Sequence, residues 1–295
     1  MRDVKFSYES GKEILHGVSF KVNKGEMVSI VGRNGAGKST ISKLICGFYK
    51  PTEGQILFEG RDLINDTIKE RAEKIGIVMQ NPNQMISKTM IFDEVALGLK
   101  VRGISEEEIK NRVFETLKVC GLYEFRNWPI SALSFGQKKR VTIASILVLN
   151  PEVIILDEPT AGLDPKERVR FRNVISSLGK NRMVLLSTHI VSDIDYIADR
   201  ILIMKNGELI QEGTEKEITD KVEGCVWKCI VSEKEAGQIT SSFIVSNMRS
   251  SGENVELRIV SERQPAAGAE NVESTLEDAY LYLTQIAGGE KNATL

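Results

Sequence analysis

The sequence has 295 residues, of which 41% are hydrophobic and 27% charged, enough for one large α/β domain or a domain with a smaller appendage. Its 39 basic and 41 acidic residues give a net charge of -2, which excludes the broad positive excess of nucleic-acid-binding proteins. No apolar run approaches the roughly 20 residues that a membrane-spanning helix needs, and residues 1–4 lead into a strand pattern, not a secretory signal. We therefore expect an intracellular protein without a membrane span of its own.

Alternating apolar residues predict strands at residues 4–8 and 14–22, and a turn then leads into the most informative stretch of the chain, residues 28–40. Here an apolar strand is followed by Gly-Arg-Asn-Gly-Ala-Gly-Lys-Ser, which fits the phosphate-loop pattern G-x-x-x-x-G-K-[ST] from Gly32 to Ser39. Glycines let backbone N–H groups turn toward a triphosphate, and the following helix adds a favourable dipole. Lys38 is placed to bind the β- and γ-phosphates, and the Ser39 hydroxyl to bind Mg²⁺. The alternative, a chance glycine-rich turn, is disfavoured by the preceding strand and by the motifs below.

The elements that follow predict a mostly parallel sheet interrupted by an all-helical insertion. A helix up to Gly47 precedes strands at 55–58 and 75–79, and residues 81–144 are mostly helical, with a capping box at Ser105 and Glu108. Strands resume at 153–156 and 183–186, separated by a helix that begins at Asp164. A short helix at 191–198 and a hairpin at 201–210 complete this part, so the fold class is α/β.

The C-terminal part changes pattern. Strands at 226–231, 243–248 and 255–260 and a helix at 276–283 predict a small α+β accessory domain, while 264–269 and the tail 288–295 are expected to be mobile. We place a nucleotide-binding cassette at 1–215, with its helical subdomain at about 81–145, the accessory domain at 216–285 and a flexible tail at 286–295. The four cysteines are interpreted as reduced and structural, because no further metal ligands lie near Cys225 and Cys229.

Two carboxylates end the buried strand at 153–156. At the carboxyl end of that strand Asp157 would reach Mg²⁺ directly or through water, and Glu158 would act as general base on the attacking water. Such a pair is commonplace alone, but it is far more specific downstream of a phosphate loop.

Residues 133–137, Leu-Ser-Phe-Gly-Gln, resemble the signature of ATP-binding cassette (ABC) proteins. Other landmarks agree in order: Gln80 after its strand, Glu-Pro-Thr-Ala-Gly-Leu-Asp at 158–164, and His189 after the strand that ends at Ser187-Thr188. The resemblance covers roughly residues 4–213. A phenylalanine, Phe135, stands where glycine is frequent in the family, and we infer no inactivity from it.

The resemblance implies a P-loop NTPase fold and a role for each matching residue. The signature of one cassette completes the ATP site of a second, with Ser134, Gly136 and a helix N-terminus closing on the γ-phosphate. The implied catalytic residues are Glu158, His189 and Gln80, and the implied Mg²⁺ ligands are Ser39, Gln80 and Asp157. The implied ATP-binding residues are Tyr8, Gly32, Arg33, Asn34, Gly35, Ala36, Gly37, Lys38, Ser39, Thr40, Ser134, Gly136, Gln137 and Asp164.

Some of these residues also have simpler structural interpretations. Tyr8 is either a platform that stacks on adenine, which the resemblance favours, or an ordinary aromatic strand residue. His189 could be an ordinary residue at a strand end, although its place in the ordered motifs argues against this. The basic run at residues 138–140 is interpreted as a solvated helix face.

The implied function is the ATP-hydrolysing subunit of an ABC transporter, peripheral on the cytoplasmic face of the cell membrane. With one phosphate loop, it would need a second ATP-binding subunit, in a homo- or heterodimer, and a separate integral membrane permease. One alternative is a soluble ABC ATPase acting on ribosomes or DNA, which the charge balance and the single cassette disfavour. Another is a different phosphate-loop enzyme such as a small-molecule kinase, which has no reason to carry the signature.

The transported substrate is less determined. Residues 79–99 resemble the ATPases of energy-coupling factor (ECF) importers of vitamins and cobalt, most closely the second cassette of their fused double ATPases. From about residue 163 to the C-terminus the chain instead resembles export-type cassettes for drugs, antimicrobial peptides or ions. We hypothesise a mosaic joined within residues 157–162, by recombination or gene-assembly error, which would affect partner choice but not the motor chemistry.

Overall fold

The computed structural model describes residues 1–9, 11–179, 182–194 and 197–286. A six-stranded sheet organises the first two thirds of this chain, in the order β11-β10-β3-β9-β8-β7. Every neighbouring pair is parallel except β10–β11, which confirms the predicted mostly parallel sheet. The strands are β3 (Met27–Val31), β7 (Ile75–Val78), β8 (Val153–Asp157), β9 (Met183–Thr188), β10 (Arg200–Lys205) and β11 (Glu208–Gly213).

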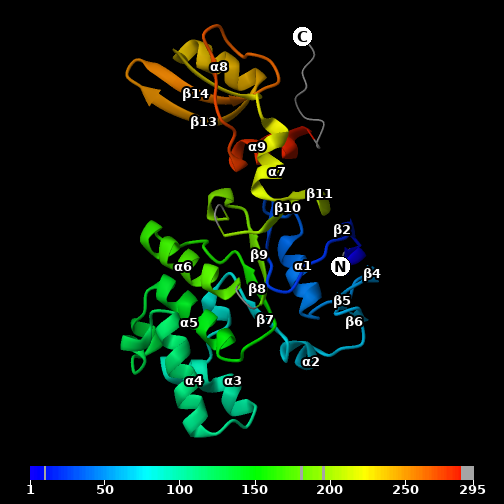
Figure 1. Cartoon of the computed structure of the whole chain (residues 1–295), viewed down its shortest axis with the longest axis vertical. Coiled ribbons are helices and arrows are strands. Elements are labelled where there is room, and N and C mark those ends of the chain that lie inside the picture. The colour runs from blue at the N-terminus through cyan, green and yellow to red at the C-terminus, as the bar shows by residue number, and fades with distance from the viewer. Residues whose placement is uncertain (10, 180–181, 195–196, 287–295) are drawn as a thin grey trace.

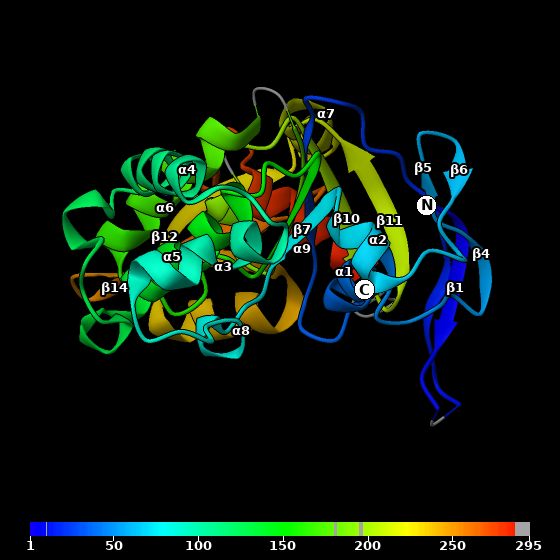
Figure 2. The ribbon, with the colours of Figure 1, turned by 90° about the horizontal axis from the view of Figure 1, so that it is seen from below.

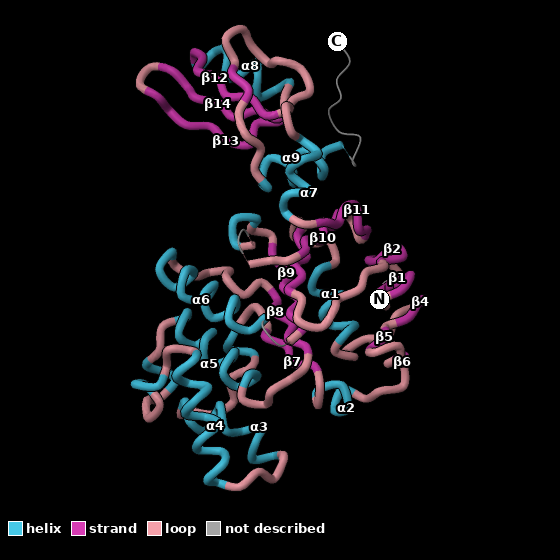
Figure 3. The backbone as a smooth tube through the Cα atoms, viewed as in Figure 1, coloured by secondary structure: helices cyan, strands magenta, loops and turns pink. Residues whose placement is uncertain are grey.

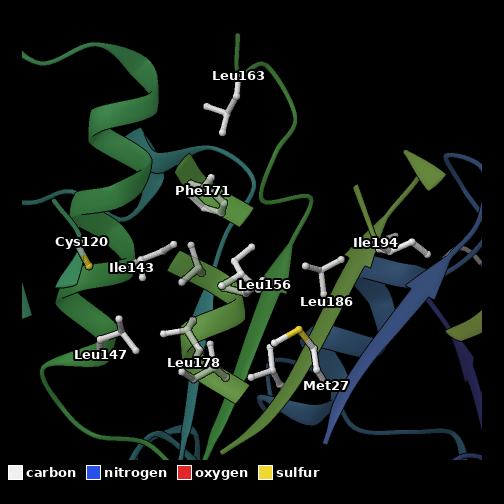
Figure 4. Close-up of a cluster of buried hydrophobic side chains, with 14 of the residues drawn as sticks. Met27, Cys120, Ile143, Leu147, Leu156, Leu163, Phe171, Leu178, Leu186 and Ile194 are labelled. Carbon is white, nitrogen blue, oxygen red and sulfur yellow. The ribbon is translucent and has the colours of Figure 1, made fainter. Parts of the chain in front are cut away.

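Helices cover both faces of this sheet, which is why its central strands are almost continuously apolar. Helix α1 (Lys38–Ile45) lies on one side and α5 (Phe135–Leu147) and α6 (Pro165–Leu178) on the other (Figure 1). Two separate hydrophobic clusters correspond to these faces. Figure 4 shows the larger one, where Leu156 and Leu186 of the strands meet Ile143 of α5 and Phe171 of α6.

A small antiparallel sheet, in the order β2-β1-β4, flanks the α1 side of the main sheet (Figure 2). The strand predicted at 14–22 ends at Val18, because its pairing with β1 ends where Val4 faces Val18. The elements here are β1 (Arg2–Ser7), β2 (Glu13–Val18), β4 (Glu53–Gln55), β5 (Leu57–Phe58), β6 (Arg61–Asp62) and α2 (Ile68–Ala72).

The predicted helical insertion contains α3 (Ile91–Val101) and α4 (Glu106–Val119) together with α5. Ser105 caps α4 by accepting a hydrogen bond from the backbone of Glu108. The helix predicted at 191–198 is instead a 3₁₀ turn over Val191–Asp193, and residues 195 and 196 of that prediction lie outside the described part of the chain.

The C-terminal part forms an antiparallel sheet in the order β13-β14-β12-β15, separate from the main sheet (Figure 3). Helix α8, which the sequence reading missed, begins at a capping box between Ser232 and Glu235 and buries Ala236 and Ile239. The mobility expected of residues 264–269 stays a prediction; in this segment Ala269 is buried and its carbonyl accepts a hydrogen bond from Gln264. The elements are α7 (Glu215–Thr219), β12 (Val226–Ser232), α8 (Glu233–Ser242), β13 (Ile244–Ser251), β14 (Asn254–Val260), β15 (Glu270–Asn271) and α9 (Leu276–Ile286).

Helix α9 packs back against the first part of the chain. Leu276, Ala279 and Tyr280 belong to the same buried cluster as α5 and α6, and Lys205 at the end of β10 donates to the carbonyl of Thr284. The domain boundary at 215–216 stays a prediction, and residues 287–295 of the predicted tail lie outside the described residues. Within the described residues, no helix combines the length and apolar character needed to cross a bilayer.

An ion pair between buried Asp278 and partly exposed Arg258 holds α9 to the accessory sheet, and its removal gives a stability prediction. Asp278 is fully buried and accepts hydrogen bonds from Arg258, with the shortest at 2.7 Å, and from Thr275. Burial alone would raise the pKa of Asp278, but hydrogen bonds from Arg258, Ser246 and Thr275 outweigh it and hold the pKa below its ordinary value. We expect Asp278→Asn to lower the free energy of unfolding by about 2 kcal/mol at pH 7, because the charge-assisted hydrogen bonds from Arg258 to the carboxylate are lost.

Urea unfolding followed across pH would measure this effect. Because the folded-state pKa of Asp278 is depressed, the stabilisation is present above about pH 3.9, the ordinary carboxyl value, and is lost as the pH falls through the folded-state value. The gap between wild type and Asp278→Asn should therefore narrow in acid. Glu277→Gln, on the exposed side of α9, is the control and should unfold like the wild type. An Asp278→Asn midpoint equal to that of the wild type at pH 7 would contradict the prediction.

Candidate active site

The glycine-rich loop between β3 and α1 is closely fitted to its surroundings. A Cβ on Gly32 would lie 2.7 Å from the backbone oxygen of Met204, and one on Gly37 would lie 2.6 Å from the Leu15 side chain. Gly37 also has a φ of 103°, a conformation that favours glycine. Because Gly32 and Gly37 have no Cβ, the backbone can turn tightly at the N-terminus of α1. Such a turn at a helix N-terminus is an anion-binding geometry.

Lys38 sits at the centre of this loop with 5% of its side chain exposed. Its ammonium donates to the carbonyls of Gly32, at 2.8 Å, and Arg33, at 3.3 Å. It also lies 3.1 Å from Oε1 of Glu158. The loop therefore holds one buried positive charge beside the carboxylate at the end of β8.

Ser39 and Asp157 form the oxygen-rich part of the site. The Ser39 hydroxyl donates to Oδ1 of Asp157 at 3.0 Å, and the hydroxyl of Ser187 donates to the same oxygen at 2.6 Å. Sequence reasoning missed Ser187, although its place two residues before His189, at the end of a strand adjacent to β8, was the available signal. Ser187 orients the Asp157 carboxylate toward Ser39.

Glu158 joins the phosphate loop to His189. Its side chain is 7% exposed, with Oε1 near Lys38 and Oε2 at 2.7 Å from Nδ1 of His189. The backbone of Glu158 has a φ of 47°, in the left-handed region that residues with a side chain rarely adopt. This turn directs the carboxylate back over the carboxyl end of the sheet.

Tyr8 stands at the edge of the loop. Its hydroxyl lies 3.2 Å from the hydroxyl of Thr40, and its ring packs edge-on against Phe6 and Tyr49. Tyr49, which sequence reasoning also missed, is 39% exposed. Phe6 of β1, Tyr8 just after it and Tyr49 after α1 thus form an aromatic cluster beside the phosphate loop.

The remaining predicted residues of this group lie at its rim. Gln80 is exposed two residues beyond the end of β7, at the edge of the main sheet where β3, β8 and β9 also end. Arg33, Asn34 and Gly35 form the exposed part of the loop, and Ala36 is buried.

Ser134, Gly136, Gln137 and Asp164 form a second group, at the starts of α5 and α6. Ser134 and Gln137 close a capping box at the start of α5, and Asp164 caps α6. A Cβ on Gly136 would lie 2.9 Å from the Glu167 side chain, so glycine lets the two helix starts approach closely. Helices α5 and α6 lie on the face of the main sheet opposite to α1, the helix that follows the phosphate loop (Figure 1).

The interpretation of residues 138–140 as a solvated face is wrong for Lys139 and Arg140, which are 1% and 5% exposed. Lys139 donates to the backbone of residues 158–161. Arg140 donates to the carbonyls of Cys120 and Gly121 and lies 3.3 Å from Glu167. Backbone carbonyls therefore accept the hydrogen bonds of the Lys139 ammonium and of one terminal nitrogen of Arg140, while the buried Nε of Arg140 has no partner among the described residues.

The residues present fit a magnesium nucleotide. A glycine cradle with one buried lysine matches a phosphate chain, and a serine hydroxyl beside a carboxylate supplies the oxygen ligands that Mg²⁺ prefers. Among the described residues no group of three or more His, Cys, Asp or Glu side chains is arranged to hold a metal by itself, so phosphate oxygens or water would have to complete the coordination.

Comparison with known proteins gives concordant matches. A family model described as "ABC transporter" matches residues 15–161. A Clostridium perfringens protein named as an ABC transporter ATP-binding protein is 61% identical over 222 residues, which are 75% of this chain and 39% of that protein. The chain thus spans about two fifths of the length of such curated relatives.

Solved structures resemble the chain over nearly their whole length. The structure of cbiO1 from Clostridium perfringens, titled as part of the ABC transporter complex cbiONQ, is 32% identical with a TM-score of 0.69, covering 81% of this chain and 97% of that one. The cassette MJ0796, described as dimeric and bound to ADP and Pi, is 32% identical with a TM-score of 0.65, covering 72% of this chain and 97% of that one.

Proposed function

This chain belongs to the ABC transporter family of ATP-binding cassette proteins with a P-loop NTPase fold, and on that premise we propose that it binds and hydrolyses ATP to drive a separate membrane permease. The observation that carries the proposal is the cluster in which Lys38 of the phosphate loop, Glu158 and His189 meet within 3.1 Å. Its members come from three elements that are far apart in the sequence. Such a convergence is what hydrolysis of a bound triphosphate requires.

Each group has a role in this proposal. Gly32 to Thr40 and Lys38 would hold the phosphates, and Ser39, Asp157 and Gln80 would hold Mg²⁺, which when bound offsets phosphate charge. Glu158 would accept a proton from water as the water oxygen bonds to the γ-phosphorus and the bond to ADP breaks. His189, at 2.7 Å from Glu158, would contact the γ-phosphate.

The second group, at the starts of α5 and α6, suits a partner's site. Ser134, Gly136 and Gln137 lie at the N-terminus of α5 and Asp164 at that of α6, and helix N-termini favour anions. These two helices lie on the face of the sheet opposite to α1, which follows this chain's own phosphate loop (Figure 1). We infer that they close on ATP held by a second ATP-binding subunit. ATP would then stabilise the pair and hydrolysis would release it, with the chain peripheral to the membrane at the cytoplasmic face of its permease.

The substrate of transport is proposed at the level of class. The likeness to cbiO1, titled as part of a transporter complex, supports an ECF-like import role for a vitamin or metal ion. The export-type resemblance of the C-terminal part leaves a drug or peptide as the alternative. Copurification of the chain with an integral membrane protein, and the identity of that protein, would decide between them.

Two further experiments separate the transporter subunit from other functions. Copurification with ribosomes or DNA but with no membrane protein would favour the soluble ABC ATPase. ATP hydrolysis without any added phosphate acceptor would argue against a small-molecule kinase, since a kinase transfers the γ-phosphate to a substrate.

Tyr8 gives a test of the adenine end of the site. We expect Tyr8→Ala to weaken ATP binding by about 3- to 10-fold, because stacking on an aromatic ring contributes roughly 0.5–1.5 kcal/mol. Tyr8→Phe keeps the ring and loses the hydroxyl contact with Thr40, so its affinity should stay close to that of the wild type. Titration with a fluorescent ATP analogue measures both variants. Equal affinity in Tyr8→Ala would show that the ring is only an ordinary strand residue.

A further inference from the structure

Lys139 is a buried cation that the proposed reaction does not use directly. It lies in α5, five residues after the helix cap Ser134, and is 1% exposed. Its ammonium donates to the carbonyls of Glu158 at 3.1 Å, Pro159 at 3.0 Å and Ala161 at 2.8 Å. An ammonium has three N–H donors, and all three donate to carbonyls of one short loop, residues 158–161.

That loop carries the strained residue of the site. A φ of 47° at a non-glycine residue is a sparsely populated conformation that persists only where the surroundings fix it. The N–H of Glu158 is held by the carbonyl of Ser187 at 2.9 Å, and its carbonyl is held by Lys139. The two hydrogen bonds fix the backbone on both sides of the side chain that meets Lys38 and His189.

The same loop touches the first residue of α5. The Phe135 ring lies 5.4 Å from the Lys139 ammonium, and a Cβ on Gly162 would be 3.3 Å from that ring. Phe135 is 41% exposed and directly follows Ser134. The start of α5 and the loop after β8 are therefore one packed unit.

We propose that Lys139 is a positioning residue that holds Glu158 in its hydrolytic geometry and couples it to the start of α5. The proposal rests on the proposed function, because it assigns Lys139 a role through the general base. A change at Ser134 or Phe135, where a second subunit's nucleotide would bind, would then reach Glu158 through Lys139. A purely structural lysine would support folding but would have no specific effect on turnover.

The charge of Lys139 offers an independent readout. Burial lowers the pKa of Lys139 to about 8, against the opposing effect of the Glu158 and Asp157 carboxylates that face it from the end of β8. The carboxylate of Glu167 in α6, near the start of α5, lies 3.3 Å from Arg140 and forms its ion pair with that residue. Loss of a proton leaves two N–H donors for three carbonyls. Turnover should therefore fall as the pH rises through about 8.

The experiment uses the full chain and compares Lys139→Met, Lys139→Gln and the neighbouring control Lys138→Met. For Lys139→Met we expect kcat to fall roughly 10- to 100-fold, as for a misplaced catalytic group, with ATP affinity within about twofold. The Gln variant keeps two N–H donors without charge, so it should recover part of kcat and lose the decline above pH 8. Lys138→Met should match the wild type in rate and pH profile.

A double mutant tests whether Lys139 acts through Glu158. In a Glu158→Gln background, Lys139→Met should change the residual single-turnover rate by less than about twofold, because the group it positions is already disabled. Full additivity in this background, equal loss of kcat and ATP affinity in Lys139→Met, or wild-type turnover in both Lys139 variants would each overturn the proposal. If neither Lys139 variant folds, the dependence of wild-type kcat on pH decides the question. A kcat that does not change between pH 7 and 9 would contradict the proposal for Lys139.

The failure of the proposed function would look different. It would appear as a wild-type chain that neither binds nor hydrolyses ATP, or as full turnover in Glu158→Gln alone. If the wild type hydrolyses ATP and Glu158→Gln does not, only the assignment of Lys139 is at stake in the experiments above.

Discussion

Replacing Glu158 with glutamine is expected to reduce ATP hydrolysis by about 10²- to 10⁴-fold while leaving ATP binding intact. Glutamine preserves the size of the side chain but cannot accept a proton from water at neutral pH, and general-base catalysis contributes a factor of this size. The phosphate loop is unchanged, so the nucleotide should still bind. Steady-state release of phosphate measures the rate, and titration with an ATP analogue measures the affinity.

Glu152 provides the matched control. It immediately precedes β8, while Glu158 immediately follows it, and it is exposed with only a weak 3.7 Å pairing to Lys74. Glu152→Gln should therefore hydrolyse ATP at the wild-type rate. Normal turnover in Glu158→Gln would refute the assignment of Glu158 as the base, whatever the control shows.

Lys38→Ala is expected to weaken ATP binding by about 10- to 100-fold, because charge-assisted hydrogen bonds contribute roughly 1.5–3 kcal/mol. The wild-type ammonium is already held in the loop by the carbonyls of Gly32 and Arg33, so it is preorganised toward bound phosphates. The variant also removes the ion pair with Glu158, which should lower kcat as well. Equilibrium binding of an ATP analogue is the decisive measurement.

The control for this variant is Lys43→Ala, one turn further along α1 and half-buried. It changes the net charge of the same helix without touching the loop, so ATP affinity should stay within about twofold of the wild type. Unchanged ATP affinity in Lys38→Ala would contradict the assignment of residues 32–39 as a phosphate-binding loop.

The sequence allowed prediction of the fold class and of the residues gathered at the phosphate loop. Strand patterns and glycine spacing are local signals, so β3, β8 and β9, the phosphate loop and the Asp157–Glu158 pair could be anticipated from them. The role of His189 after β9 was implied by the family resemblance. Helix α8 was missed because Ala236 and Ile239 are the only apolar residues among its ten, and the Ser232–Glu235 capping box is its main sequence signal.

The partners of Lys139 and Arg140 could not be predicted for a different reason. A run of basic residues reads as solvated, since a buried cation is costly unless it is satisfied. Here both side chains donate to backbone carbonyls from segments about 20 residues away in the sequence. Only the folded chain brings those carbonyls to the helix. The same holds for Ser187, whose hydrogen bond to Asp157 depends on the pairing of β8 with β9.

The central claim is that the phosphate loop of one subunit and the Ser134 segment of another form a single ATP site. The most direct test measures the molecular mass of Glu158→Gln in solution, with and without ATP and Mg²⁺, by light scattering coupled to gel filtration. If the second subunit is another copy of this chain, we expect twice the mass of the chain with ATP and Mg²⁺ and the mass of one chain without them, and we expect added Ser134→Glu to abolish the pairing. If the second subunit is a different protein, we expect the same ATP-dependent pairing with the ATP-binding subunit that copurifies with the permease. A Glu158→Gln protein that binds ATP and yet pairs neither with itself nor with that subunit would contradict the shared site.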